Sequence, residues 1–440
     1  MSPRAQQRER AAAPREPVRL LVADAEGRVY DHPELRLAGE RGAGPEPIGA
    51  REWIPLPRGS DLFALPGRAP IGLRARTPVV VDAWLGGEAR AVAAFLAPAH
   101  TSCHHAVWVT REGAPVLPTF AYSAVGFADG QYWTSAFRAD PDPRQDPWRF
   151  TEARVRRGID SLRAELPRNR VARQLETCAL RYGCRAAQNF FLGRHEAPLP
   201  SSSACNAQCI GCISLQPDGA FRASHDRLAK PPSGAELAAV ALSHLGRVPD
   251  GVVSFGQGCE GEPLLFAPAL VDAVRRIRAE TTRGTVHLNS NASKPDAVRA
   301  LCAAGLDSIR ASLNSPRPGV YDAYYQPRGY GVAEVAESLR SVVQAGRHAS
   351  INLLCFPGVT DTEAELDALA ELVAQTGLHA VQLRNLNIDP ELYRANLPAG
   401  SVAKGRGLRW LRRQLARRFP RLRFGYFNAA VGAARERKAG

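Results

Sequence analysis

The stretch TVHLNSNASKPDAVRALCAAGLDSIRASL, residues 285–313, spans one strand–helix–strand repeat. Residues 285–291 and 308–313 are predicted strands, and residues 293–305 between them form a helix candidate that ends at a glycine. Strands that alternate with helices are typical of a parallel sheet or a βα barrel. This repeat therefore predicts an α/β fold.

The same alternation continues on both sides of this stretch. The predicted strands are a weak one just before Cys205, then 251–255, 285–291, 308–313, 350–356 and 380–386. The predicted helices are 233–245, 267–280, 293–305, 332–346, 361–377 and 407–419. Because eight strands close a full barrel, six predict an open, partial (β/α)6 TIM-like barrel. In such folds the chemistry lies at the C-terminal ends of the strands.

Changes of pattern divide the chain of 440 residues into five predicted segments. Strand-like stretches with Gly-containing turns precede the proline-rich DPDPRQDP, and helix-like stretches follow it. The segments are a disordered N-terminus (1–16), a β-rich N-terminal domain of unknown role (17–147), a helical connector (148–197), the barrel core (198–390), and a basic C-terminal helix and tail (391–440).

The composition is that of an ordinary globular chain, with 45% hydrophobic and 23% charged residues. The first twenty residues have no apolar core of a secretory signal, and no apolar run is long enough to span a membrane. Nine unevenly spaced cysteines argue against a disulfide framework. We therefore expect a cytoplasmic protein with reduced thiols and no membrane partner.

Most of the net charge of +14 belongs to the last forty residues. They carry twelve Lys and Arg residues against Glu436 alone, a net charge of +11. Leu408, Leu411, Leu415 and Phe419 recur at helical spacing among these cations, which predicts a final helix packed on the barrel with a solvated basic face. An acidic partner, or RNA, for the same face is the alternative.

The segment SSSACNAQCIGCIS, residues 201–214, concentrates three of the nine cysteines in the spacing C-x3-C-x2-C. Thiolates favour zinc or iron–sulfur clusters. A structural zinc ion needs four protein ligands, and a 4Fe–4S cluster normally takes four cysteines. A cluster held by Cys205, Cys209 and Cys212 alone would leave one iron open for a ligand. A Cys3His zinc site and unligated buried cysteines are the alternatives.

This cysteine spacing, in the loop after the first strand of a six-fold βα repeat, resembles the radical S-adenosylmethionine (radical SAM) superfamily. The resemblance covers residues 198–390. It implies a 4Fe–4S cluster on the three cysteines and S-adenosyl-L-methionine on the open iron. It further implies reductive cleavage of that cofactor to a 5′-deoxyadenosyl radical, with an electron donor such as a ferredoxin or flavodoxin. No cysteine follows Cys355, so we expect a single cluster.

The resemblance also implies residues that bind the cofactor. Gly261 and Glu262, followed by Pro263, match the family's glycine-rich motif after the second strand, whose acid binds the cofactor ammonium, although Glu260 is a rival for that role. Asn291 after the third strand, and Arg310 with Ser312 on one face of the fourth, are further candidates. Polar residues of the last two strands are weaker candidates, for ribose or substrate contacts: Asn352, Gln382, Arg384, Asn385 and Asn387.

One position departs from the family pattern, because Gly211 stands where many members have an aromatic residue beside the adenine. No residue is predicted to act directly on the substrate, which is a peptide, an RNA or a small molecule. Two other classes of function stay open. One is an RNA-binding module stabilised by its metal, and the other is an iron–sulfur protein for electron transfer or sensing.

Overall fold

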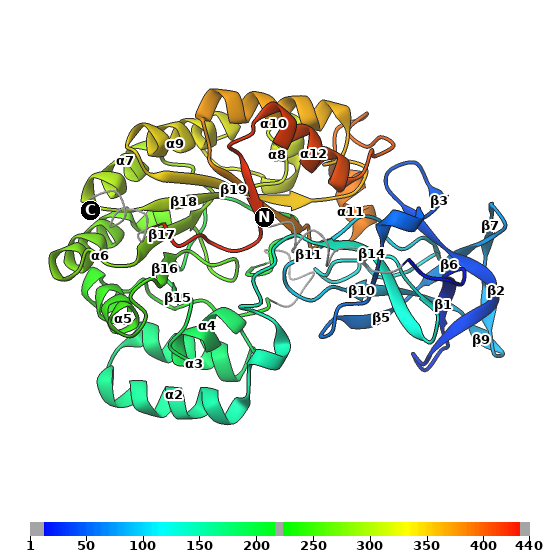
Figure 1. Ribbon diagram of the computed structural model, residues 1–440, viewed down its shortest axis with the longest axis horizontal. Coiled ribbons are helices and arrows are strands. Elements are labelled where there is room, and N and C mark those ends of the chain that lie inside the picture. The colour runs from blue at the N-terminus through cyan, green and yellow to red at the C-terminus, as the bar shows by residue number, and fades with distance from the viewer. Residues whose placement is uncertain (1–12, 216–222, 432–440) are drawn as a thin grey trace. The chain divides into compact units, whose positions relative to one another are not determined.

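The computed structural model describes residues 13–215 and 223–431 (Figure 1). These residues divide into two compact units. The N-terminal unit comprises the described residues up to Pro141, together with Cys355–Leu366 and Leu383–Arg417. The barrel unit comprises the described residues of Asp142–Leu354, Asp367–Gln382 and those from Arg418 onward. In the part of the chain that the structure describes, no helix is both long and apolar enough to cross a membrane.

The N-terminal unit is β-rich, as predicted, and most of its strands form one sheet. The chain turns at Asp24–Arg28, where Asp24 accepts the backbone N–H groups of Glu26 and Arg28, and strands β1 and β2 pair on either side of this turn. The strands are β1 (Arg19–Ala23), β2 (Val29–Glu40), β3 (Pro45–Pro47), β4 (Trp53–Pro55), β5 (Asp61–Leu65), β6 (Arg68–Arg74), β7 (Thr77–Val80), β8 (Ala83–Trp84), β9 (Gly87–Glu88), β10 (Arg90–Phe95), β11 (His100–Ser102), β12 (Trp108–Thr110), β13 (Val125–Ala128) and β14 (Gln131–Arg138).

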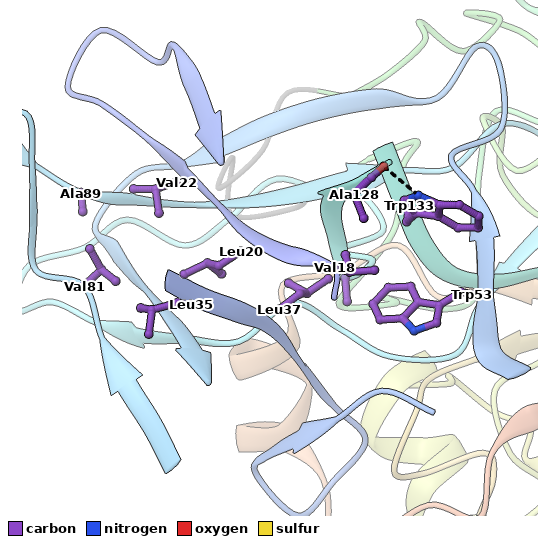
Figure 2. Close-up of a cluster of buried hydrophobic side chains, with 11 residues drawn as sticks. Val18, Leu20, Val22, Leu35, Leu37, Trp53, Val81, Ala89, Ala128 and Trp133 are labelled. Carbon is purple, nitrogen blue, oxygen red and sulfur yellow. Dashed lines mark hydrogen bonds between the residues drawn. The ribbon is translucent and has the colours of Figure 1, made fainter. Parts of the chain in front are cut away.

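Both faces of strand β1 are buried. Alternate residues of a strand point to opposite faces, and Leu20 and Val22 belong to a cluster with Leu35 and Trp133 (Figure 2). The indole N–H of Trp133 donates to the carbonyl of Ala128 at 3.1 Å, so this large ring is buried without losing its hydrogen bond. The opposite face packs against a second cluster of Leu21, Ala23, Val92, Ala94, Leu96, Val125 and Ala136.

The barrel unit contains the parallel strands that the sequence predicts. The order is β15 (Glu196–Leu199), β16 (Val252–Phe255), β17 (Thr285–Ser290), β18 (Ser308–Leu313), β19 (His348–Cys355) and β20 (Ala380–Asn385), which is also their order along the chain. A seventh strand, β21 (Arg423–Gly425), extends this sheet beyond β20 in parallel, and the sequence analysis missed it because it is only three residues long. The fold is the predicted open βα arrangement with one added edge strand.

Helices follow the strands and lie on the outer side of the curved sheet (Figure 1). Ser233 caps α5 by accepting the N–H of Glu236, whose carboxylate returns to the Ser233 N–H, as the capping-box spacing predicts. The helices are α2 (Glu152–Glu165), α3 (Arg170–Leu180), α4 (Arg185–Phe191), α5 (Gly234–Arg247), α6 (Ala267–Glu280), α7 (Pro295–Ala304), α8 (Pro318–Tyr325), α9 (Val332–Gln344), α10 (Glu363–Thr376), α11 (Pro390–Asn396) and α12 (Leu408–Arg418).

The two chain ends are described only in part. The predicted disorder of residues 1–16 falls mostly on residues 1–12, which lie outside the described residues, as does the end of the basic tail, 432–440. The backbone N–H groups of Arg15 and Glu16 donate to the carboxylate of Asp129 at 2.7 and 3.2 Å, which holds the start of the described chain.

Candidate functional site

The three clustered cysteines lie in the loop that follows β15, at the C-terminal end of the first barrel strand. All three are free thiols of intermediate exposure. The Cys212 N–H donates to the carbonyl of Cys209 at 3.0 Å, and the Leu215 N–H points at the Cys212 sulfur at 3.4 Å. The loop is therefore folded back on itself, with a backbone donor directed at one ligand sulfur.

Electrostatics makes this loop a poor place for thiolates without a cation. Burial raises the pKa of the Cys209 thiol well above its usual value, and neighbouring Cys212 and Cys205 raise it further. Burial likewise raises the pKa of Cys205, and the carboxylate of Glu262 adds to that effect. Iron ions would remove this penalty, because a metal stabilises the deprotonated ligand. The donor set therefore suits a cationic cluster.

The described residues contain no group of three or more His, Cys, Asp or Glu side chains placed to hold a single metal ion. The ligands of a four-iron cluster need not converge on one point, because each cysteine binds a different iron. The arrangement of the three thiols is thus compatible with a cluster.

The glycine-rich stretch after β16 packs directly on the cysteine loop. A Cβ atom at Gly261 would lie 1.9 Å from the carbonyl oxygen of Ala204, and the Glu262 N–H donates to that same oxygen at 2.7 Å. At Gly256 the backbone has a φ of +74°, and a Cβ would lie 1.9 Å from the carbonyl oxygen of Asn289. Only glycine permits both approaches.

Glu262 is buried at the junction of this stretch with β17. Its carboxylate accepts the N–H of Leu264 at 2.9 Å, the hydroxyl of Ser290 at 2.6 Å and the N–H of Asn291 at 2.7 Å. Burial raises its pKa to about 7, against the lowering effect of these donors. Its charge also raises the pKa of the Cys205 and Cys209 thiols, so Glu262 lies near the predicted metal ligands.

Glu260 has a different environment. Its carboxylate accepts the backbone N–H groups of Ser201, Ser202 and Gln257 at 2.5, 2.6 and 2.9 Å, and burial raises its pKa to about 8. Its charge acts on the thiols of Cys178 and Cys259. The geometry therefore favours Glu262 over Glu260 as the acid beside the cysteine loop, and Glu260 fastens the entry to that loop.

Asn291 connects the end of β17 to the cysteine loop. Its side-chain amide donates to the Asn206 side chain at 2.8 Å, and the Asn206 amide in turn donates to the Ser293 hydroxyl at 3.0 Å. Asn206 directly follows Cys205, so these bonds position the first predicted ligand. The sequence analysis selected Asn291 but missed Asn206, whose only signal was its place next to a cysteine.

Arg310 and Ser312 lie on one face of β18, as their spacing predicts, while Ile309, Ala311 and Leu313 on the other face are fully buried. The Arg310 guanidinium donates to the side-chain oxygen of Gln382 at 2.8 Å. Ser312 is two residues nearer the C-terminal end of the strand and is paired with Asn352 of β19. Ser312 is thus closer than Arg310 to the end where the cysteine loop begins.

A polar network that the sequence did not predict connects several strands of the barrel unit. Asn428, from the segment after β21, accepts from Gln382 at 3.2 Å and donates to Glu196 at 2.9 Å. The Ser254 hydroxyl also donates to Glu196, at 2.5 Å. Asn428 lies outside every predicted element, so no periodic pattern could have pointed to it. Gln382 therefore contacts Arg310 and Asn428.

The predicted final helix is present as α12 and its apolar face is buried, but most of it belongs to the N-terminal unit and not to the barrel unit. Leu408, Leu411 and Leu415 of α12 are each 1% exposed. Arg418 pairs with Asp367 at 2.9 Å, and the Arg409 guanidinium lies over the Phe137 ring at 5.0 Å. Part of the cationic surface is therefore occupied by contacts within the protein.

Residues 199–371 match the family model described as the Radical SAM superfamily. The chain is 29% identical over 182 residues to the GTP 3′,8-cyclase of Streptomyces coelicolor (strain ATCC BAA-471 / A3(2) / M145). That alignment covers 41% of this chain and 49% of the relative, so the chain spans about half the length of the curated relative that it matches.

Two solved structures are also similar. A radical SAM methyltransferase from Sphaerobacter thermophilus has 18% identity and a TM-score of 0.38, with 53% of this chain and 67% of that chain covered. Streptococcus suis SuiB bound to S-adenosylmethionine has 13% identity and a TM-score of 0.37, with 53% and 50% covered. The family model and the curated relative, together with the cysteine loop, support a radical SAM domain in residues 199–371 of this chain.

Proposed function

We propose that this protein is a radical SAM enzyme that holds a 4Fe–4S cluster on Cys205, Cys209 and Cys212 and binds S-adenosyl-L-methionine at the remaining iron. The observation that carries the proposal is the contact between two loops. The cysteine loop after β15 and the glycine-rich loop after β16 meet at Gly261, which brings the buried Glu262 near Cys205 and Cys209.

When bound, the cluster and the cofactor would supply one-electron radical chemistry, the reductive cleavage of S-adenosyl-L-methionine. The three cysteines supply thiolates. Glu262 supplies a carboxylate with three donors already in place, and because a carboxylate has about four acceptor positions, one is left for the ammonium group of the cofactor. Ser312 lies near the C-terminal end of β18, from which its hydroxyl could donate to the cofactor. Arg310 donates to Gln382 and would contribute indirectly, by positioning that side chain.

The protein also needs partners for this function. The reaction needs an electron donor, such as a ferredoxin or flavodoxin, and an acidic partner for the basic tail is a further candidate. The curated relative is named as a cyclase of GTP. Its alignment covers 41% of this chain and supports a radical step that the two proteins share. Residues outside that shared part select the substrate, which is a peptide, an RNA or a small molecule.

The decisive experiment measures 5′-deoxyadenosine from anaerobically reconstituted protein with S-adenosyl-L-methionine and dithionite. We expect product from the wild type and none from the Cys205/Cys209/Cys212 triple-Ala variant. A wild type that carries a cluster but makes no product, with or without candidate substrates, would favour the electron-transfer or sensor function. A protein that binds zinc and no cluster would favour the RNA-binding module.

A further inference from the structure

A tyrosine-rich segment, YDAYYQPRGY (residues 321–330), lies against the cysteine loop. The Gln208 N–H donates to the carbonyl of Tyr325 at 3.0 Å, and the Ile210 N–H donates to the carbonyl of Tyr324 at 3.0 Å. These two bonds bracket Cys209. The middle ligand of the predicted cluster is therefore fixed to the last turn of α8.

The contact continues beyond this turn. Gln326, with a φ of +42°, reverses the chain, Pro327 bridges Ala207, and the Arg328 N–H donates to the carbonyl of Asn206 at 2.9 Å. The segment after α8 therefore runs along the cysteine loop and is held by backbone bonds that do not depend on any side chain. A side-chain substitution in this segment can keep the whole contact.

The rings of Tyr321, Tyr324 and Tyr325 form one buried group near Cys209, and the half-buried Tyr330 adjoins it. The Tyr321 and Tyr325 rings stack with centroids 4.5 Å apart, and Tyr324 meets Tyr325 edge-on at 4.9 Å. The Tyr321 and Tyr330 hydroxyls lie 3.4 Å apart, within reach of each other. The charge of Cys209 acts on the phenols of Tyr321, Tyr325 and Tyr330 alike, which places all three rings close to that thiol.

The hydroxyl of Tyr325 stands out in this group. It is inaccessible to solvent, and the residue as a whole is only 4% exposed. The hydroxyl has no hydrogen-bond partner among residues 13–215 and 223–431. A buried hydroxyl without a partner is destabilising, because it has given up its hydrogen bonds to water. Such a donor is retained when it has a partner that these residues do not supply.

We propose that the Tyr325 hydroxyl donates a hydrogen bond to a sulfide of the cluster held at Cys209, and that Tyr325 thereby influences the reduction potential of the cluster. The inference rests on the proposed function, because it requires the cluster. Reduction adds negative charge to the sulfurs, so a donor aimed at them favours the reduced form. Tyr325 would thus ease the electron uptake on which the proposed reaction depends.

The test is an anaerobic redox titration of the reconstituted cluster, followed by electron paramagnetic resonance, on the wild type and Tyr325→Phe. The variant keeps the ring, its stack on Tyr321 and the backbone bonds. At the potential where half of the wild-type cluster is reduced, we expect the reduced-to-oxidised ratio of the variant to fall roughly three- to tenfold, the effect of one hydrogen bond. Tyr122→Phe is the matched control, because it removes a buried phenol that donates to the Pro118 carbonyl in the N-terminal unit.

A Tyr325→Phe protein with full iron content and the wild-type potential would overturn the inference while leaving the proposed function intact. A wild type that binds no cluster would overturn both. A second measurement does not need the variant: wild-type protein with ring-deuterated tyrosine is studied by electron–nuclear double resonance of the reduced cluster. Deuteron coupling from a tyrosine ring is expected, and its absence would remove Tyr325 from the cluster.

Discussion

Single residues decide which of two neighbouring acids serves the site. Glu260 and Glu262 are separated by one glycine, and both are buried with raised pKa values. Their partners differ, because Glu260 accepts three backbone N–H groups near the loop entry, whereas Glu262 lies with Ser290 and Asn291 beside the cysteines. Hydrogen-bond partners, more than sequence position, therefore distinguish Glu260, which fastens the loop entry, from Glu262, the proposed ligand-binding acid.

The three cysteines give the first prediction at this scale. Cys209→Ala should abolish cluster binding, because only two thiolates would remain on the loop. Iron and sulfide content and visible absorbance after reconstitution measure this loss. Cys302→Ala is the control, since Cys302 is 4% exposed within α7 and is not one of the proposed ligands. Full cluster absorbance in Cys209→Ala would contradict the assigned ligand set.

Glu260 gives a pH prediction. Its folded pKa of about 8 exceeds the ordinary value of 4.5, so the folded protein binds a proton that the unfolded chain has released in that interval. Stability must then fall as the pH rises from about 4.5 to 8. Between about pH 5.5 and 7.5 this single group removes about 2.5 kcal/mol from the free energy of unfolding.

Denaturant unfolding of the metal-free protein at these two pH values measures the effect. Glu260→Gln should be less stable than the wild type near pH 5.5, because an amide nitrogen then faces a backbone donor, but its stability should depend less on pH. The exposed Glu280→Gln serves as the control. An equal pH dependence in Glu260→Gln and the wild type would contradict the raised pKa.

At the scale of elements, close packing of two loops creates the site. Gly261→Ala would place a Cβ 1.9 Å from the Ala204 carbonyl oxygen, which is backbone and cannot move aside cheaply. We expect a loss of roughly 3 kcal/mol or more in stability, as for other severe overpacking, together with weak cluster binding. Thermal unfolding and iron content are the measurements.

Gly258→Ala is the matched control in the same loop. Its Cβ would meet only the Cδ1 atom of Ile213, at 3.4 Å, and this flexible side-chain end can adjust. The control should keep its cluster and nearly all of its stability. If both variants behave alike, the close approach at Gly261 is not what joins the two loops.

At the scale of the whole molecule, the N-terminal unit is assembled from segments far apart in sequence. Arg68 of β6 and Asp389, the N-cap of α11, form an ion pair at 3.2 Å in which each side chain is only 2% exposed. Asp389 also accepts the Leu117 N–H at 2.7 Å. The unit therefore depends on Leu383–Arg417 as well as on its β strands.

Asp389→Ala should cost roughly 3–5 kcal/mol, because it leaves the buried Arg68 charge with only the more distant and more exposed carboxylate of Glu391, at 3.5 Å. Urea unfolding measures the loss. Glu34→Gln is the control, because it removes an ion pair with Arg74 in which both side chains are mostly exposed, and such pairs contribute little. A similar small effect in both variants would show that the Arg68 charge finds another partner.

The sequence by itself determined the parts of this protein that depend on local pattern. Strand and helix alternation predicted six barrel strands, and the capping-box spacing predicted the start of α5. The cysteine spacing predicts three metal ligands, which stay a prediction. These signals are short-range, because hydrophobic period and capping act over a few residues. The three-residue β21 and the isolated Asn428 carry no such period, so they were missed.

Only the tertiary structure decided which residues from different strands meet. It brought Glu262 to the cysteine loop, paired Arg310 with Gln382, and laid the tyrosines of α8 along Cys209. The aromatic run YDAYYQPRGY was visible in the sequence, but its partner lies more than a hundred residues earlier. Such contacts depend on the curvature of the sheet and on steric fit at a few glycines. A local sequence pattern cannot predict either.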